Sequence, residues 1–338
     1  MSYDPNLPQS KSEVQTHAAL TPKDHWLDLK FGLFIHFGIN TFNDVEWSDG
    51  TLSPSTYNPM KFDANQWCEA AKSAGVGYLM LVTKHHDGFC NWPSRWTRDY
   101  SVEASPFKRD VVGEVAAACK NAGIKLAFYY SLWDRHAPMY DDDRAYALYM
   151  KRHLTELLTQ YGEVVELWFD GGWKKTTVHC QDVERWHWRE IYEHIKSIQP
   201  DCLVGNNGTT DRPGEIITYP CDLLFGEKTI PNEGDKDKKW WLDPLYAYGL
   251  NDTKLPFESQ FTLSKGGGKK DAMFGDGKWF WHADDDTVQD AKWVVDTLNL
   301  CNERGANFVI NAGPSNEGLL RELDVKCLRE VGKLRGIS

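Results

Sequence analysis

Short apolar runs alternate with longer amphipathic stretches along most of the chain. Apolar runs bounded by turn residues predict buried strands, and apolar positions at helical spacing predict the helices that cover them. This alternation is typical of repeated strand–helix units around a parallel sheet. Residues 1–22 are polar and are interpreted as a lead, so we expect a single domain over residues 23–338.

About eight strands and six helices are predicted in this domain. The strands are expected at residues 31–37, 78–83, 124–130, 164–169, 203–205, 223–225, 257–263 and 308–310. The helices are expected at residues 64–73, 111–121, 145–161, 183–198, 287–303 and 324–334. Asp63 is a predicted N-cap, and Gly75 and Gly123 end two of the helices. The order predicts the α/β class and a somewhat irregular (β/α)8 barrel of the TIM type.

Composition narrows the classes of partner. The formal net charge is −11 and no basic run occurs, which argues against nucleic acid and anionic membranes as partners. No apolar stretch is long enough for a transmembrane helix. The N-terminal residues lack the pattern of a signal peptide, so we expect a cytoplasmic protein whose eight cysteines are reduced. Fifteen tryptophans suit either sugar stacking or an aromatic-rich core.

Polar side chains follow five successive predicted strands. They are His36, the run His85-His86-Asp87, the run Tyr129-Tyr130-Ser131, Asp170, and the pair Asn206-Asn207. Active sites of barrels are assembled from the carboxyl ends of the strands. One histidine at a strand end is commonly structural, but five polar strand ends in succession favour a site.

Asp170 belongs to the most informative segment, Val164-Val-Glu-Leu-Trp-Phe-Asp170-Gly-Gly-Trp173. A buried strand ends in a carboxylate, and two glycines then allow a tight turn. A buried carboxylate is costly unless donors surround it, so Asp170 needs partners or a function. The residues themselves leave open a nucleophile, a metal ligand, and a helix-capping or turn aspartate.

Metal binding is the competing use of His36, His85, His86 and Asp170. Neighbouring histidines would point to opposite faces of a continuing strand, and neither an HExxH nor an HxH motif occurs. A serine nucleophile lacks its GxSxG elbow, and the cysteines have no evident activating partner. These patterns argue against metal catalysis and against a serine or cysteine nucleophile.

Several segments together resemble glycoside hydrolase family 29, the α-L-fucosidases. These are Lys30-Phe-Gly-Leu-Phe-Ile-His36-Phe-Gly38, Glu46-Trp47, Lys84-His-His-Asp-Gly-Phe89, Tyr129-Tyr-Ser131 and Leu167-Trp-Phe-Asp-Gly-Gly172, with Asn307-Phe-Val-Ile-Asn-Ala-Gly-Pro314 and Gly318 matching the last barrel strand. The resemblance implies a retaining exo-α-L-fucosidase that forms a covalent fucosyl-enzyme intermediate and uses no metal and no organic cofactor. Further likeness around Asn40-Thr-Phe42 and Cys90-Asn-Trp-Pro-Ser94 implies the subgroup that acts on α-1,3/1,4-fucosides.

Carried over by position, the resemblance makes Asp170 the nucleophile. It implies that a further set of residues grips the hydroxyls and ring of fucose: His36, Glu46, Trp47, His85, His86, Tyr129 and Trp168. The methyl group of a 6-deoxy sugar needs an apolar wall, for which Trp47, Trp168 and Trp281 are the candidates. The implied partner is a fucosylated oligosaccharide or glycoconjugate, and the oligomeric state is left open.

Two features depart from the family. The usual C-terminal β-sandwich is not expected, because the chain stops just after the segment that closes the barrel. The acid/base position is also ambiguous. Glu215, after the Asp211-Arg212 element, is our first choice, Glu258 is the runner-up and Glu227 is third. An inactive fucose-binding barrel and a metal-dependent barrel hydrolase are the alternative functions.

Overall fold

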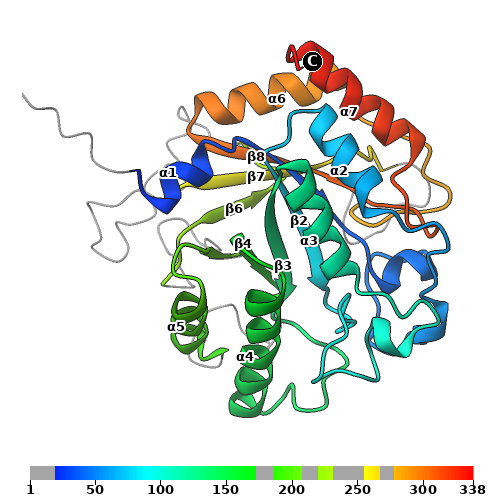
Figure 1. Ribbon diagram of the computed structural model, residues 1–338, viewed down its shortest axis with the longest axis vertical. Coiled ribbons are helices and arrows are strands. Elements are labelled where there is room, and N and C mark those ends of the chain that lie inside the picture. Colours follow the sequence, from blue (N-terminus) through cyan, green and yellow to red (C-terminus); the bar gives the residue numbers. More distant parts are fainter. Residues whose placement is uncertain (1–19, 173–185, 208–219, 231–254, 267–277, 338) are drawn as a thin grey trace, which may run out of the picture.

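The chain forms one sheet of eight parallel strands, which curls into a nearly closed barrel with helices outside it (Figure 1). The computed structural model describes residues 20–172, 186–207, 220–230, 255–266 and 278–337. The strands follow the order β5-β4-β3-β2-β1-β8-β7-β6, so the first and last strands of the sequence pair with each other. The predicted α/β barrel is confirmed.

Each predicted strand is present, with bounds that shift by at most two residues. The strands are β1 (Phe31–Ile35), β2 (Tyr78–Lys84), β3 (Lys125–Ser131), β4 (Val164–Asp170), β5 (Leu203–Asn206), β6 (Leu224–Glu227), β7 (Phe257–Thr262) and β8 (Ala306–Ala312). The helices are α1 (Pro22–Leu27), α2 (Ala64–Ser73), α3 (Val111–Ala122), α4 (Asp143–Gln160), α5 (Trp188–Ile198), α6 (Ala291–Glu303) and α7 (Glu322–Leu334).

The helix ends follow local capping chemistry. The Asp63 side chain accepts from the backbone of α2, and Gly123 ends α3 with φ 73°, as predicted. The predicted start of α6 at residue 287 is wrong, because Asp290 is the N-cap. α1 was not predicted at all, although Thr21 and Asp24 form a capping box at its start. It lies at the end of the segment interpreted as a lead.

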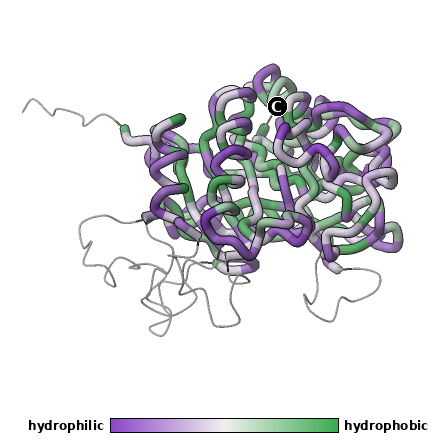
Figure 2. Tube along the Cα trace, turned by 90° about the horizontal axis from the view of Figure 1, so that it is seen from below, coloured by the Kyte–Doolittle hydropathy of each residue, from purple (hydrophilic) through white to green (hydrophobic). Residues whose placement is uncertain are grey.

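The core has an inner and an outer layer, because a parallel barrel strand is buried on both faces. Phe34, Met80, Tyr129, Trp168 and Val309 belong to the cluster inside the barrel. A larger apolar cluster joins the outer faces of the strands to the surrounding helices. Figure 2 shows hydrophobic stretches in the interior and hydrophilic stretches mostly at the periphery.

β5 and β6 are the end strands of the sheet, and isolated hydrogen bonds rather than a regular ladder join them. The Asp222 backbone N–H donates to the Val204 carbonyl (2.6 Å), and its carboxylate accepts from the Val204 N–H (3.0 Å). At Gly205 a Cβ would lie 2.6 Å from the Phe225 ring, so glycine lets the two strands approach. This seam lies next to β4, the strand that carries Asp170.

The amino-terminal end of the barrel is filled by a buried carboxyl pair, Glu166 and Glu258. The Trp26 indole donates to Glu166 (2.8 Å), and the Tyr78 hydroxyl donates to Glu258 (2.5 Å). Burial raises the pKa of Glu166 well above its ordinary value and that of Glu258 to about 7. These side chains and α1 close this end, which leaves the carboxyl ends of the strands for a site.

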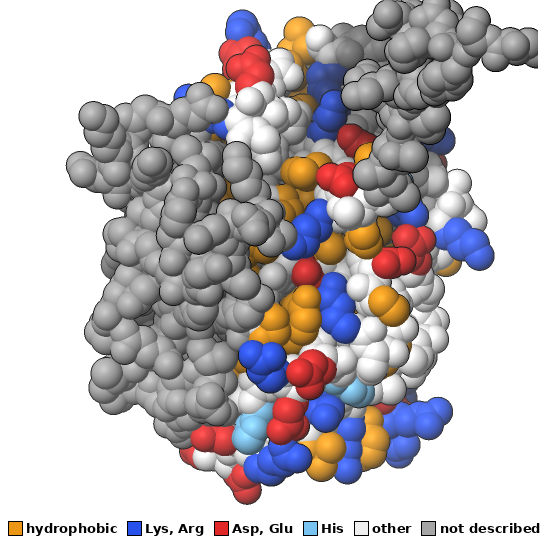
Figure 3. Space-filling model, turned by 90° about the vertical axis from the view of Figure 1, so that its left-hand side faces the viewer, with side chains coloured by type: hydrophobic (Ala, Val, Ile, Leu, Met, Phe, Trp, Pro, Cys, Tyr) orange, Lys and Arg blue, Asp and Glu red, His pale blue; other side chains and the backbone are white. Residues whose placement is uncertain are grey.

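The described surface is mixed in charge. On the face in Figure 3, basic and acidic side chains are interspersed on the described surface. None of the described helices is both long and apolar enough to cross a membrane. All seven cysteines in the described ranges are free and buried, and Cys180 lies outside them.

Candidate active site

Five neighbouring strands bring the predicted polar residues together at one end of the barrel. β4 ends in Asp170, and its neighbour β3 carries Tyr129 and Ser131 near its own end. His85 and His86 follow β2, and His36 follows β1. Because β2 stops at Lys84, the two adjacent histidines are not forced to opposite faces, and their ring centroids lie 4.1 Å apart.

Asp170 is 6% exposed and receives hydrogen bonds from three segments of the chain. The Tyr129 hydroxyl donates to Oδ2 (2.8 Å), and the Gly171 N–H (2.8 Å) and Asn207 Nδ2 (3.1 Å) both donate to Oδ1. Burial raises the pKa of Asp170 to about 6, while these three donors lower it. The carboxylate is therefore ionised at neutral pH, as a nucleophile must be.

Gly171 makes the turn after Asp170 sterically feasible. Its φ is +76°, and a Cβ there would lie 2.7 Å from the Trp133 side chain. A residue with a side chain would be strained at this φ and would push against Trp133. The glycine that follows Asp170 thus brings a backbone N–H onto the carboxylate.

His36 presents an acceptor nitrogen because of the orientation of Asn311. The Asn311 Nδ2 donates to the Trp279 carbonyl (2.7 Å), so its Oδ1 accepts from the His36 Nδ1–H (2.6 Å). Burial lowers the pKa of His36 to about 3. The ring is therefore neutral at pH 7, and its Nε2 carries a lone pair that can accept from a hydroxyl group.

The hydrogen bonds of Ser131 likewise determine which His86 ring nitrogen carries a proton. The Ser131 hydroxyl donates to the Trp133 carbonyl (2.7 Å), so it accepts from the His86 Nδ1–H (2.7 Å). The remaining nitrogen, Nε2, lies 3.6 Å from Asp170 Oδ2. Burial and the neighbouring His86, His36 and Lys84 lower the pKa of His85 well below its ordinary value. These rings form a polar wall beside the carboxylate.

Aromatic side chains enclose this wall. Trp168 is buried, with ring centroids 5.2 Å from Tyr129 and 4.9 Å from Phe225, and so forms part of the floor. Trp47 lies edge-on to His86, with ring centroids 4.9 Å apart. Trp279 and Phe280, neighbours of the predicted Trp281, contact the His36 ring at 5.1 Å and 5.3 Å between centroids. Trp281 itself is partly exposed.

Glu46 holds the aromatic segment that carries Trp279 and Phe280. Its carboxylate accepts from the Trp279 N–H (3.2 Å), the Phe280 N–H (3.3 Å) and His282 Nε2 (2.8 Å). His282 also contacts Asp44 through Nδ1 (2.9 Å). Both carboxylate oxygens of Glu46 are thus engaged by the protein, and the residue positions this segment against His36.

The three acid/base candidates lie in different places. Glu215 lies outside the described residues. Glu258, the runner-up, is the second residue of β7 and is fully buried in the carboxyl pair at the amino-terminal end of the barrel. It lies away from Asp170, which ends β4, so its position argues against acid/base catalysis. Glu227 ends β6 and shares Asn207 with Asp170.

Comparisons with known proteins agree with this arrangement. The family model described as Alpha-L-fucosidase matches residues 5–335. The chain belongs to the α-L-fucosidase family. It is 33% identical to Alpha-L-fucosidase 1 of Arabidopsis thaliana over 321 residues, which cover 92% of this chain and 58% of that protein. The chain thus spans little more than half the length of that relative.

Solved structures of the family share the fold. A glycoside hydrolase 29 family member from an unknown rumen bacterium is 30% identical, with a TM-score of 0.73, over 93% of this chain and 56% of that one. An α-L-fucosidase from Bacteroides thetaiotaomicron, described as a covalent intermediate trapped with 2-fluoro-fucosyl fluoride, is 24% identical, with a TM-score of 0.73, over 92% and 73% of the respective chains.

Several site residues were not singled out from the sequence. Asn311, His282 and Phe280 act on the family's histidine wall, but they come from the last third of the chain, where the predicted elements are least regular. The run Trp279-Phe-Trp-His282 was a usable signal, because aromatic residues rarely cluster with a histidine on a surface loop. Among the residues that the structure describes, no three His, Cys, Asp or Glu side chains gather as a metal site would require.

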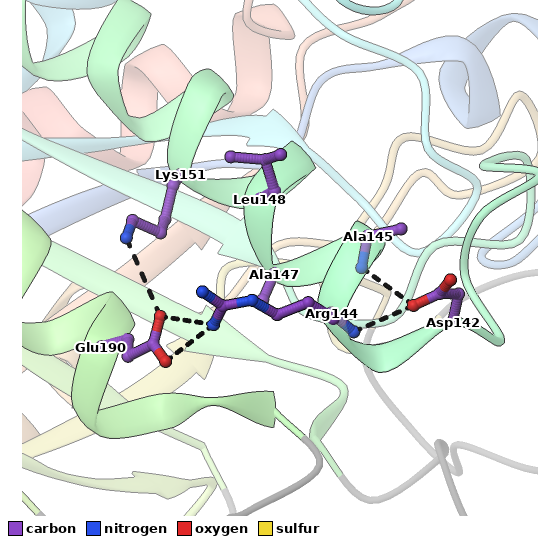
Figure 4. A pocket seen from close by; sticks show the side chains of 7 residues that line it. All are labelled: Asp142, Arg144, Ala145, Ala147, Leu148, Lys151 and Glu190. Atoms are coloured by element: carbon purple, nitrogen blue, oxygen red, sulfur yellow. Dashed lines mark hydrogen bonds and ion pairs between the residues drawn. The ribbon is translucent and has the colours of Figure 1, made fainter.

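A surface groove between α4 and α5 is separate from this family site (Figure 4). Its lining includes Leu148 and Lys151, and Arg144 forms an ion pair with Glu190 (2.7 Å) across it. None of the candidate site residues lines the groove. We assign it no role in the chemistry.

His282→Ala should destabilise the protein most strongly at low pH. Burial alone would lower the pKa of His282, but the bond to Glu46 and the charges of Glu46 and Asp44 leave it raised. A histidine whose pKa is higher in the folded than in the unfolded protein stabilises the fold fully at a pH below its unfolded-state pKa. That stabilisation is lost as the pH rises through its folded-state pKa. Urea unfolding should show a loss of about 1–3 kcal/mol at pH 6 that narrows at pH 9.

The exposed His25, replaced by alanine, is the control and should change stability little at either pH. An equal loss for His282→Ala at both pH values would mean that the charge of His282 contributes nothing.

Proposed function

We propose that this chain is a retaining exo-α-L-fucosidase, which removes terminal α-L-fucose from oligosaccharides or glycoconjugates. The observation that carries the proposal is the donor-stabilised carboxylate of Asp170 beside the wall of His36, His85 and His86. Membership of the α-L-fucosidase family supports it. The trapped covalent intermediate of the Bacteroides thetaiotaomicron relative is a precedent for the retaining mechanism.

In the first step, an Asp170 oxygen attacks the anomeric carbon while the bond to the leaving oxygen breaks. A general acid protonates that oxygen, and a covalent fucosyl-enzyme ester remains. In the second step, the same group, now a base, takes a proton from water, which displaces Asp170 from the sugar. Two inversions at the anomeric carbon give net retention.

The histidine wall suits the sugar hydroxyls. His36 Nε2 is a lone-pair acceptor, and the His86 ring offers the same nitrogen close to Asp170. A hydroxyl that donates to such an acceptor keeps its own oxygen available to other donors. The neutral His36 ring can thus bind a hydroxyl of a neutral sugar without adding charge to the site.

We propose Glu215 as the acid/base. A retaining pair of carboxyls lies about 5–5.5 Å apart, and the acid must hold its proton near neutral pH. Glu215 follows β5 in the sequence, and β5 pairs with β4, the strand that ends in Asp170. The buried position of Glu258 at the other end of the barrel supports the choice by removing its main rival.

We propose α-1,3/1,4-linked fucose as the substrate, on the motif likeness to that subgroup. The wild-type chain should release fucose from an aryl α-L-fucoside and from a Lewis-type trisaccharide faster than from a 2′-fucosylated one, as measured by the fucose released. Faster hydrolysis of the 2′-fucosylated sugar would contradict the proposed preference for α-1,3/1,4-linked fucose.

The same assay, repeated after dialysis against EDTA, separates the alternatives. Binding of fucose without turnover would indicate an inactive fucose-binding barrel. Loss of activity that zinc restores would indicate a metal-dependent hydrolase.

Asp170→Gly should reduce kcat by roughly 10³-fold or more, because it removes the covalent step. Azide added to this variant should attack from the vacated face and give a β-fucosyl azide, detectable by NMR. Near-normal activity of the variant would refute the assignment of the nucleophile.

Glu215→Ala should impair hydrolysis of a fucosylated oligosaccharide much more than that of an activated aryl fucoside. Acid assistance matters most for a poor leaving group. Azide should accelerate the aryl reaction and give an α-configured product, because the deglycosylation step has lost its base. If Glu258→Ala alone showed this behaviour in parallel assays, Glu258 would be the acid/base and Glu215 would not.

A further inference from the structure

One amide group joins two carboxylates at the seam of the barrel. Asn207 Nδ2 donates to Asp170 Oδ1 (3.1 Å) and to Glu227 Oε1 (2.8 Å). A side-chain amide has two N–H bonds, and each is used by one carboxylate. Glu227 thereby reaches the candidate nucleophile although β6 forms no ladder with β5 and lies at the far end of the sheet order.

The placement of Asn207 is determined by the backbone. Its N–H donates to the Phe169 carbonyl (2.7 Å), which continues the pairing of β4 with β5 by one residue beyond Asn206. The side chain can still rotate its amide, which would turn the carbonyl oxygen toward Asp170. A carboxylate repels that oxygen, and Glu227 on the other side opposes the same rotation.

Glu227 thus selects the orientation in which Asn207 donates to Asp170. With only one acceptor, a flipped amide would lose a single hydrogen bond. With two acceptors, a flipped amide would lose both hydrogen bonds and place its oxygen against both carboxylates. The Glu227 carboxylate therefore keeps the Asn207 N–H directed at Asp170.

The two carboxyls also influence each other electrostatically. Desolvation, and then the charge of Asp170, raise the pKa of Glu227 to about 7, although the residue keeps an exposed side. The groups facing the pair in the described chain are Tyr129 from β3, His86 after β2, and Lys228, with Asp87 acting on Tyr129. Two neighbouring carboxyls compete for one negative charge, so their titrations are linked.

We propose that Glu227 is a positioning residue for the nucleophile, acting through Asn207 to orient a donor to Asp170 and to share its charge. The proposal rests on the proposed fucosidase activity, and it differs from acid/base catalysis, in which Glu227 would protonate the leaving group. In the positioning role, loss of Glu227 slows hydrolysis equally for good and poor leaving groups. In the acid/base role, it slows hydrolysis mainly for poor ones.

Glu227→Ala and Glu227→Gln separate the two effects of the side chain. Alanine removes both the acceptor and the charge, whereas glutamine keeps a carbonyl that can accept from Asn207. Glu227→Ala should lower kcat roughly 10- to 100-fold, equally for an aryl fucoside and an oligosaccharide. Glu227→Gln should retain more activity. Its acid limb of kcat/KM should stay near that of the wild type, because Glu227 still holds its proton at the pH where Asp170 titrates.

Glu317→Gln, an exposed glutamate paired with Lys61, is the matched control and should keep the wild-type profile. A loss confined to the poor leaving group, with azide rescue, would assign Glu227 to acid/base catalysis and overturn the proposal. Activity of Glu227→Ala within twofold of wild type, or a loss in Glu227→Gln as large as that in Glu227→Ala, would also overturn it.

A stability measurement makes the coupling testable without any substrate. Asp170→Asn, Glu227→Gln and the double variant form a cycle whose unfolding free energies are compared at pH 8. Both carboxyls are ionised there, so removing one should relieve repulsion and reduce the gain from removing the second. Additive effects would contradict the coupling. A coupled cycle in a chain that hydrolyses no fucoside would instead refute the proposed function and Glu227's catalytic relevance.

Discussion

The carboxyl end of the barrel depends on keeping Asp170 charged although its side chain is buried. An ion buried without partners would take up a proton, and a protonated aspartate cannot attack a sugar. Tyr129, Gly171 and Asn207 prevent this by donating to Asp170 from three separate parts of the chain. Burial still raises its pKa to about 6, so the carboxylate is ionised but less strongly solvated than it would be in water. His36 and His85, whose pKa values burial lowers, add polar groups to the site without a competing charge.

The barrel supplies these donors because parallel strands end at the same edge. β3 and β4 pair in register, which places Tyr129 beside Trp168 and Ser131 beside Asp170. The irregular join between β5 and β6 then brings Asn207 and Glu227 together where a regular ladder is absent. Opposite this edge, the buried Glu166–Glu258 pair and α1 close the barrel. The two ends thus contain similar carboxyl chemistry, but only one of them holds the histidines.

Sequence pattern predicts the eight strands, the barrel and the polar strand ends that meet at the site. It identifies Asp170 and the three histidines, because each ends or closely follows a predicted strand. Glu258 is the second residue of the predicted strand 257–263, so the direction of that strand already placed it at the amino-terminal end, away from the polar strand ends. The sequence pattern missed His282 and Asn311, whose roles depend on contacts with Glu46 and His36 made across more than two hundred residues. Glu215 lies outside the described residues, and its role stays a prediction.

Labelling with 2-fluoro-fucosyl fluoride tests the central claim most directly. The fluorine at carbon 2 slows both chemical steps, because it destabilises the positive charge that develops on the sugar. The fluoride at the anomeric carbon is a good leaving group and keeps the first step fast. The covalent ester therefore accumulates. After proteolysis, mass spectrometry should find one fluorofucosyl group per chain, on the peptide that contains Asp170. The Asp170→Gly variant should remain unlabelled. Labelling of a different carboxylate, or stoichiometric turnover with no labelled peptide, would contradict the account.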